Sequence, residues 1–318
     1  MLALEEAARA SLHAPSVFNT QPWTWRIAGD TMELSADPTR KLDSTDAEGR
    51  LLVLSCGAAL HHARTALSAA GWSATVERLP DASRPGLLAR IRLGVPVPPD
   101  PQAQRMAAAI PRRRTDRRAY GEREVADAEL TELRRLVEGQ GAYLHVVRPD
   151  QVVMLAISAE LAGGAELDDP SYRTELQRWT SRPELAGDGV PQATAVRQEL
   201  RRVPVRDFAP GSPAGLPAGA AHDQGAAYVV VFGDDDQPAN LLRGGEALSA
   251  LLLQATADGL ATAPISDPIE VEWPRHLLRG LLADIGEPYL VIRLGYATSD
   301  ATLPPAPRRR PSDVIFTE

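Results

Sequence analysis

The clearest pattern along the chain is a long apolar stretch in its first third. From about Glu48 to Ala70, apolar residues cover most of the circumference of a predicted helix that ends at Gly71. A surface helix would keep one polar face, so this pattern predicts a helix at the centre of the fold. We expect Cys56 to be a small buried thiol of that helix. The apolar positions are Leu51, Leu52, Leu54, Cys56, Ala58, Ala59 and Leu60.

Shorter patterns flank this helix. Residues 2–12 have the composition of a helix, and residues 24–27 and 32–36 alternate as the two strands of a hairpin around a Gly-Asp turn. Residues 73–79 and 87–93 predict two more strands. The proline-rich residues 95–101 read as a linker that closes the first half of the chain.

The second half repeats this order. Residues 127–138 predict a helix, 142–147 a strand, 245–259 a long apolar helix, and 289–296 a strand. The segment Ala89-Arg90-Ile91-Arg92-Leu93-Gly94 is echoed by Val291-Ile292-Arg293-Leu294-Gly295-Tyr296. The shared order indicates an internal duplication of an α+β unit, with residues 1–100 as the first repeat and 101–318 as the second. The second repeat carries an insertion at about 168–224, whose polar helical part and Pro- and Gly-rich part suit a mobile lid or a surface excursion.

Composition narrows the class of protein. The 318 residues include 44% hydrophobic residues, enough for a sizeable core, and the net charge of −8 argues against a nucleic-acid partner. No run is long enough to span a membrane, and the N-terminus lacks the features of a signal peptide, so we expect a cytoplasmic protein. Basic residues are almost all arginine, so an isolated Arg says little and only clusters count.

The loop from Ala14 to Trp23 has the most informative polar composition. Pro15 and Pro22 restrict the backbone, while Ser16, Asn19 and Gln21 supply hydrogen-bond donors and acceptors. Two interpretations are open for this loop. It is either a rigid edge for a flat, hydrogen-bonding ligand or a turn and helix-cap cluster that ends at an aromatic anchor.

Three further segments carry candidate chemistry. The cluster Arg113-Arg114-Thr115-Asp116-Arg117 is either a phosphate site made of guanidinium forks and a hydroxyl or a solvated basic turn. The segment Ala263-Pro264-Ile265-Ser266 either lies along a ring edge or simply starts a strand after a helix stop. The run Arg308-Arg309-Arg310 either completes an anionic pocket or forms a solvated tail.

Several other chemistries lack support. No Gly-x-Gly-x-x-Gly follows a predicted strand, and there is neither a P-loop nor a Gly-x-Ser-x-Gly elbow. A single cysteine excludes an intramolecular disulfide and a Cys-rich metal site. His61 and His62 are adjacent on a predicted helix, so they do not form an i, i+4 metal pair, and we assign no metal site.

Taken together, these motifs resemble the FMN-dependent nitroreductase family, in particular its Acg-like subgroup. The resemblance rests on the Pro15-Ser16-x-x-Asn19-x-Gln21-Pro22-Trp23 loop, the Arg-Arg-Thr cluster, the central apolar helix, the Ala-Pro-Ile segment and the basic tail. The loop occurs only in the first half and the arginine cluster only in the second. The chain is therefore similar to a fused nitroreductase dimer in which one of two sites survives, with an α+β fold of two tandem, mainly antiparallel sheets packed with helices.

The resemblance implies roles for these residues. Arg113, Arg114, Thr115 and Arg117 would hold the FMN phosphate and ribityl chain, with Arg308 or Arg310 adding charge from the tail. Pro15, Ser16, Asn19 and Gln21 would contact the flavin from the other half, and Ala263, Pro264, Ile265 and Ser266 would lie along its ring system. We expect Asp116 to turn toward Arg117 or Arg118 rather than toward the phosphate.

The implied activity is an oxidoreductase that passes a hydride from NAD(P)H through FMN to a nitroaromatic, quinone or similar small-molecule acceptor, with no catalytic side chain. Two alternatives remain open. The chain could sequester or store FMN with little turnover, because one site is lost and the insertion could close over the flavin. It could also catalyse a specialised flavin-dependent biosynthetic step. A fused pair completes its site alone, so we expect a monomer or a weak homodimer.

Overall fold

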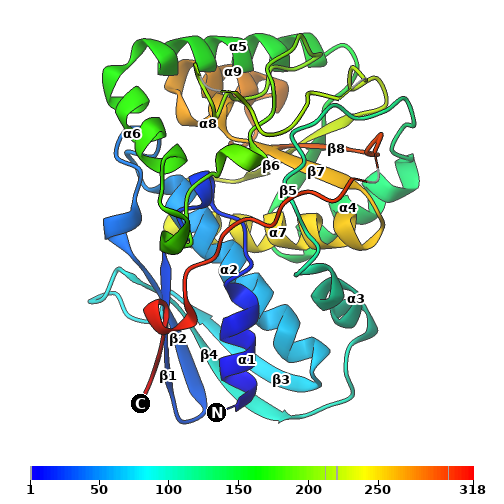
Figure 1. The fold of residues 1–318 in the computed structure, drawn as a ribbon. Helices are drawn as coiled ribbons and strands as arrows, with labels where there is room; N and C mark the ends of the chain where they lie inside the picture. The colour runs from blue at the N-terminus through cyan, green and yellow to red at the C-terminus, as the bar shows by residue number, and fades with distance from the viewer. Residues whose placement is uncertain (1, 212, 220, 300) are drawn as a thin grey trace.

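Two β-sheets lie on opposite sides of a central pair of long helices (Figure 1). The structure is a computed structural model that describes residues 2–211, 213–219, 221–299 and 301–318. The first part of the chain forms α1 (Leu2–Ser11), β1 (Trp23–Ala28), β2 (Thr31–Ala36), α2 (Arg50–Ala69), β3 (Trp72–Arg78) and β4 (Leu87–Pro96). The rest forms α3 (Pro101–Ala109), α4 (Asp127–Gly139), β5 (Tyr143–Val146), α5 (Val152–Asp168), α6 (Pro170–Thr180), β6 (Ala227–Gly233), α7 (Pro238–Ala257), β7 (Ala261–Ile265), α8 (Asp267–Glu270), α9 (Glu272–Leu281), β8 (Glu287–Gly295) and β9 (Ile315–Thr317).

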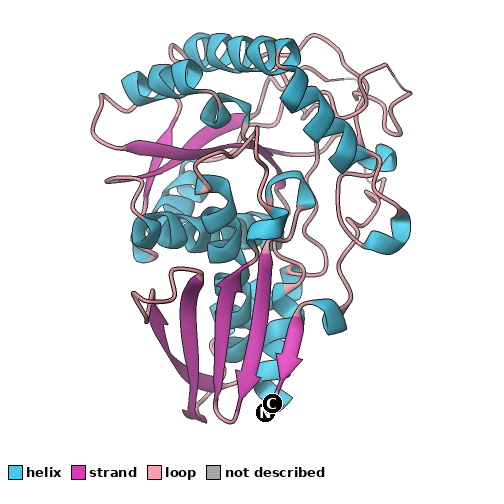
Figure 2. Ribbon diagram, turned by 90° about the vertical axis from the view of Figure 1, so that its left-hand side faces the viewer, coloured by secondary structure: helices cyan, strands magenta, loops and turns pink. Residues whose placement is uncertain are grey.

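The first sheet has the strand order β3-β4-β2-β1-β9. The predicted hairpin is confirmed as the antiparallel pair β1 and β2, in which Trp25 lies opposite Leu34. Trp23, Trp25 and Ile27 are buried while Arg26 between them is exposed, which is the alternation of a sheet with one covered face. The C-terminal strand β9 joins this sheet parallel to β1, so both termini lie at the same end of the molecule (Figure 2).

The second sheet has the order β5-β6-β8-β7, and all its neighbours are antiparallel. Its central strands β6 and β8 are buried along almost their whole length. The predicted strands 142–147 and 289–296 are confirmed as β5 and β8. The predicted α+β class with two mainly antiparallel sheets is confirmed as well. The division of the chain at residue 100 stays a prediction.

Helices α2 and α7 cross at two glycines. A Cβ added to Gly57 would lie 2.1 Å from the carbonyl oxygen of Leu242, and one added to Gly245 would lie 2.0 Å from the carbonyl oxygen of Leu54. The same number of residues separates Gly57 from Gly245 and Leu54 from Leu242. The two contacts are therefore related by an approximate two-fold axis, as expected for equivalent helices of two repeats.

The prediction for the first long helix is confirmed, because α2 is buried on nearly all sides and Cys56 is fully buried in it. The prediction for the second was too short at its start. Helix α7 begins at Pro238, where proline suits the first helical turn, and it continues through Gly244 and Gly245 because both pack against neighbouring elements. The predicted linker 95–101 was also wrong in extent, since β4 runs to Pro96 and α3 begins at Pro101.

The predicted insertion contains α6 and a long irregular segment that returns to β6. Residues 212 and 220 of this insertion lie outside the described part of the chain. Its apolar residues Tyr172, Leu176, Trp179 and Phe208 form a cluster with Phe18 and Leu42 of the first half. The insertion is thus packed onto the loop that precedes β1. Among the described residues, no helix combines the length and apolarity that a membrane-spanning segment needs.

Candidate functional site

Two adjoining cavities lie where the two halves of the chain meet. The first, which we call the apolar cavity, encloses about 900 Å³ including its open mouth, and the second, which we call the cationic cavity, about 660 Å³. The two cavities share five lining residues: Pro15, Ser16, Phe18, Thr115 and Arg117. The structure therefore brings the Pro15–Trp23 loop and the arginine cluster to one continuous site.

The cationic cavity is lined by four arginines, Arg113, Arg114, Arg117 and Arg308, of which Arg117 also lines the apolar cavity. None of Arg113, Arg114 and Arg308 forms an ion pair with any residue that the structure describes. Arg113 is only 4% exposed, and its Nε and Nη1 atoms have no partner. Burial and the neighbouring charge of Arg114 lower the pKa of Arg113 to about 10. An uncompensated, buried positive charge with free donors is the arrangement expected of an anion site.

Burial and the nearby arginine charges also lower the pKa values of Arg308 and His13. Burial, Arg113 and Arg114 lower the pKa of Arg308 to about 9. Desolvation and the charges of Arg308, Arg114 and Arg113 lower the pKa of His13. Asp116, by contrast, turns away as expected, because its carboxylate pairs with Arg118 at 2.8 Å. The lowered pKa values reflect the positive surroundings of the cavity, and the pairing of Asp116 with Arg118 leaves that charge uncompensated.

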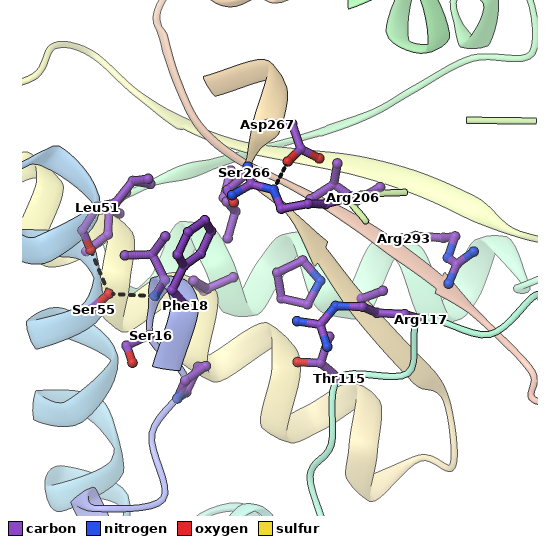
Figure 3. Close-up of a pocket in the computed structure, with 18 of the residues that line it drawn as sticks. Ser16, Phe18, Leu51, Ser55, Thr115, Arg117, Arg206, Ser266, Asp267 and Arg293 are labelled. Atoms are coloured by element: carbon purple, nitrogen blue, oxygen red, sulfur yellow. Dashed lines mark hydrogen bonds and ion pairs between the residues drawn. The ribbon is translucent and has the colours of Figure 1, made fainter. Parts of the chain in front are cut away.

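The Pro15–Trp23 loop is held in an unusual conformation. Phe18, Asn19 and Gln21 all have left-handed backbone angles, which are uncommon outside glycine. The hydroxyl of Ser16 accepts a hydrogen bond from the backbone N–H of Gln21 at 2.9 Å, which braces the turn. Phe18 thereby points into the apolar cavity, as Figure 3 shows. The strain is concentrated at the site, where it fixes the lining residues.

Asn19 and Gln21 join the loop to distant segments. Asn19 Nδ2 donates to the carbonyl oxygens of Gly189 and Pro307, and its Oδ1 accepts from Arg308 at 2.7 Å. Gln21 is fully buried, donates to the carbonyl oxygen of Gly187 and accepts from the N–H of Arg309. Asn19 lines the cationic cavity, whereas Gln21 lines neither cavity. Gln21 thus positions the insertion and the tail.

The three tail arginines go to three different places. Arg308 lines the cationic cavity, and Arg309 donates to the carbonyl oxygens of Gln21 and Trp23. Arg310 is exposed and pairs with Asp313 at 3.0 Å. The structure therefore corrects the assignment of Arg310 to the site, because neither cavity includes it and its charge already has a partner.

The apolar cavity is walled by both halves of the chain. Ala263, Pro264, Ile265 and Ser266 line it from β7 and the turn that follows, as predicted from the sequence. Leucines of α2, α7 and β8 form much of the remaining wall: Leu51, Leu54, Leu248 and Leu290. Arg117 enters with its guanidinium 4.4 Å above the Phe208 ring, a cation–π contact. Burial and the nearby charge of Arg206 lower the pKa of Arg117 to about 10, so it stays charged at neutral pH.

Arg206 and Phe208 of the insertion were not predicted as site residues. Both line the apolar cavity, and Figure 3 shows Phe18, Arg117 and Arg206 converging on it from three segments. The Phe18 and Phe208 rings meet edge to face, 5.6 Å apart. Sequence reasoning offered no signal for Arg206, because a lone arginine in an arginine-rich chain is uninformative.

Arg206 is fixed by three buried carboxylates. Its guanidinium pairs with Asp267, with Glu270 at 2.6 Å and with Glu166 at 3.3 Å. Burial and the neighbouring acids raise the pKa of Glu166 to about 10 and also raise that of Glu270, although Arg206 opposes both shifts. The carboxylate oxygens lie within 4.8 Å of one another, but Arg206 already provides the cation among them.

The fold and the site define a protein of two α+β repeats on one chain, with a ligand cavity between them whose charged end suits an anion. Over 315 residues the chain is 39% identical to a Mycobacterium tuberculosis H37Rv protein named "Putative NAD(P)H nitroreductase Rv3131", a match that covers 96% of this chain and 88% of the relative. It is 36% identical over 316 residues to "Putative NAD(P)H nitroreductase acg" of the same strain, with 98% and 95% covered. The chain thus belongs to the nitroreductase superfamily and has Acg-like relatives.

The crystal structure of the FMN-dependent nitroreductase NfnB from Mycobacterium smegmatis in complex with NADPH matches with a TM-score of 0.43 and 17% identity, covering 66% of this chain and 96% of NfnB. No protein-family profile matches the chain.

Proposed function

We propose that the chain binds FMN in the two adjoining cavities and uses it to oxidise NAD(P)H and reduce a nitroaromatic, quinone or similar acceptor. The observation that carries this proposal is the cationic cavity, in which Arg113, Arg114 and Arg308 have no counter-charge among the described residues and which shares five lining residues with the apolar cavity. FMN has a phosphate, which would suit the cationic cavity, and a flat ring system, which would suit the apolar cavity. The names of the relatives support the same assignment.

Different residues of the site would bind the phosphate and the ring system of FMN. Arg113, Arg114 and Arg308 would hold the phosphate, and the hydroxyl of Thr115 and the charge of Arg117 stand where the two cavities join. The segment from Ala263 to Ser266 would lie along the ring system. When bound, FMN would supply the hydride and electron transfer, so no side chain need act as a nucleophile.

The leucines and Phe18 give the apolar cavity a wall that would displace water from a bound ring system, which would strengthen the effect of the nearby charges. Both halves of the site come from one chain. A second copy is therefore not needed to complete it, and we propose that the protein functions without obligatory dimerisation.

The test is an absorption spectrum of the purified protein, before and after addition of FMN, followed by anaerobic addition of NADPH and then NADH. Flavin bands that bleach rapidly are the expected result. A protein that binds no flavin after FMN addition would refute the proposal. Bands that persist with both nucleotides would refute the reductase part and leave FMN binding intact.

A second candidate function, FMN sequestration, has its own supporting observation. The insertion contributes Val205, Arg206 and Phe208 to the wall of the apolar cavity, and Arg206 is fixed by three carboxylates. A wall anchored in this way would restrict the approach of a nicotinamide ring to the flavin. Persistent flavin bands in the experiment above, together with slow release of FMN, would favour this function.

A further inference from the structure

The arginine cluster lies in an irregular segment with little support from regular secondary structure. Residues 110–126 connect α3 to α4, and Thr115 makes only an isolated parallel bridge to Thr262. The N–H of Asp116 donates to the carbonyl oxygen of Thr262 at 2.9 Å, which is the hydrogen bond of that bridge. Because loops of this kind are mobile unless they are tied down, other groups must set the orientation of Thr115 and Arg117.

Arg293 of β8 makes the main contacts that hold this segment in place. It is 1% exposed, and its Nη2 donates to the carbonyl oxygens of Asp116 at 3.0 Å and Arg118 at 2.8 Å. These two carbonyl groups flank Arg117. In the sheet, Arg293 lies directly opposite Ala263 of β7. One side chain therefore connects the arginine segment to the strand that lines the apolar cavity.

Asp223, near the end of the insertion, holds Arg293 in this position. The Asp223 side chain is fully buried, and its Oδ2 accepts from Arg293 Nη1 at 2.7 Å. Its Oδ1 accepts from the backbone N–H of Tyr120 at 2.7 Å. The Tyr120 ring lies 4.1 Å from the guanidinium carbon of Arg293, and its hydroxyl donates to the carbonyl oxygen of Asp116. The Arg293–Asp223 pair thus fixes the arginine segment at three backbone positions.

The charge balance separates this pair from the anion site. The full charge of Asp223 neutralises Arg293, whereas Arg113, Arg114 and Arg308 have no such partner in the described structure. Arg293 lines the apolar cavity, but two of its three nitrogens already donate to Asp223 and to backbone carbonyl groups. Its Nε has no partner among the described residues, whereas its two Nη atoms, which make all its hydrogen bonds to the described residues, hold other residues in place.

We propose that Arg293 and Asp223 are positioning residues that set the FMN affinity of the site by orienting the Thr115–Arg118 segment. The proposal rests on the proposed binding of FMN. It assigns the insertion a supporting role in the site, which Arg201 shares by donating from Nη1 to the carbonyl oxygen of Arg117 at 2.6 Å. Disruption of the pair should loosen the segment while leaving Arg113 and Arg114 present.

The experiment compares the native chain with Arg293→Lys and Asp223→Asn. The lysine keeps the charge but loses the fork that spans two carbonyl groups and a carboxylate. The asparagine keeps the shape but replaces one acceptor with a donor. Each variant should bind FMN at least tenfold more weakly, measured by fluorescence titration, and should change the visible circular dichroism of the bound flavin.

Glu246→Gln is the matched control. Glu246 is fully buried and is paired with Arg64 and Arg78, but it lines neither cavity. It should lower the melting temperature about as much as Asp223→Asn does, while its FMN affinity stays within twofold of native. Native affinity in both site variants would overturn the positioning role. An affinity loss of the same size in Glu246→Gln would also overturn it, because general destabilisation would then explain the effect.

Hydrogen exchange of the apoprotein provides a readout that does not depend on FMN. The amides of residues 116–120 should exchange at least tenfold faster in Asp223→Asn than in the native chain, while those of the central helices should be unchanged. Unchanged exchange at 116–120 would overturn the proposal even if FMN binding fell. If the native chain binds no FMN and Asp223→Asn still exchanges faster at residues 116–120, the proposed function and the role of the pair in FMN affinity are both refuted. Only the structural role of the pair in holding this segment would then stand.

Discussion

Replacing Arg113 with methionine should have opposite effects on the stability of the apoprotein and on FMN binding. Arg113 is buried without a counter-charge, and its pKa of about 10 lies below the ordinary 12.5. A fall of that size corresponds to about 3 kcal/mol for holding the charge in the folded chain. Methionine keeps an apolar stem of similar length and removes the charge.

The magnitudes follow from these contacts. We expect Arg113→Met to raise the free energy of unfolding of the apoprotein by about 1–3 kcal/mol, and the melting temperature by roughly 1.5–4.5 °C for a chain of this length. FMN binding should weaken, because one charge-assisted hydrogen bond to phosphate is worth about 1.5–3 kcal/mol, or roughly 10- to 150-fold in affinity. With saturating FMN, the difference in melting temperature should shrink or reverse.

The assay is thermal unfolding by circular dichroism with and without FMN, alongside fluorescence titration of FMN. Arg112→Met is the control, because Arg112 is exposed, lines neither cavity and donates from its side chain to the carbonyl oxygen of Ala108. It should change neither quantity appreciably. A lower melting temperature for the Arg113→Met apoprotein would refute the argument that its charge is uncompensated, and unchanged FMN affinity would refute its role at the phosphate.

Three further predictions concern other parts of the molecule. Gly57→Ala should lower the free energy of unfolding by about 3 kcal/mol or more in thermal or urea unfolding, because the added Cβ would collide with a backbone carbonyl of the facing helix. The control Gly164→Ala places its Cβ in open space and should be neutral or stabilising. Burial lowers the pKa of His61 to about 3, so as the pH falls below 6.5 the unfolded state binds a proton at this histidine before the folded state does. Between pH 8 and pH 5 the wild-type protein should therefore lose about 2 kcal/mol more of its free energy of unfolding than the His61→Asn variant loses. Equal losses in the two proteins would contradict this prediction. If the insertion restricts access, Phe208→Ala should raise NAD(P)H oxidation severalfold while the exposed control Leu200→Ala should not; equal rates would argue against restriction.

The sequence predicted those parts of the fold that local patterns determine. The central helix and the hairpin were found because burial on all sides and alternation leave direct traces in the residue order. The start of α7 was missed because Gly244 and Gly245 suggest a helix boundary. Their reason for being glycine is contact with α2 and Tyr289, which no local pattern reveals.

The candidate site divides in the same way. The loop, the arginine cluster and the Ala263–Ser266 segment carry compact motifs, so they could be predicted before their proximity was known. Arg308 and Arg310 are chemically identical, and only the path of the tail decides which one reaches the cavity. Arg206 and Asp223 act through residues far away in the chain, so only the folded structure reveals them.

The crossing of α2 and α7 has a consequence for how this protein can evolve. In a symmetric pair of identical chains, every residue near the two-fold axis meets its own copy, and each mutation appears twice. Here His61 and Ser249 occupy equivalent places on the two helices, and the His61 ring nitrogen Nδ1 lies 2.8 Å from the Ser249 hydroxyl. Because both helices belong to one chain, each side of the axis can change separately, so a histidine on one helix can be matched by a different hydrogen-bonding partner on the other.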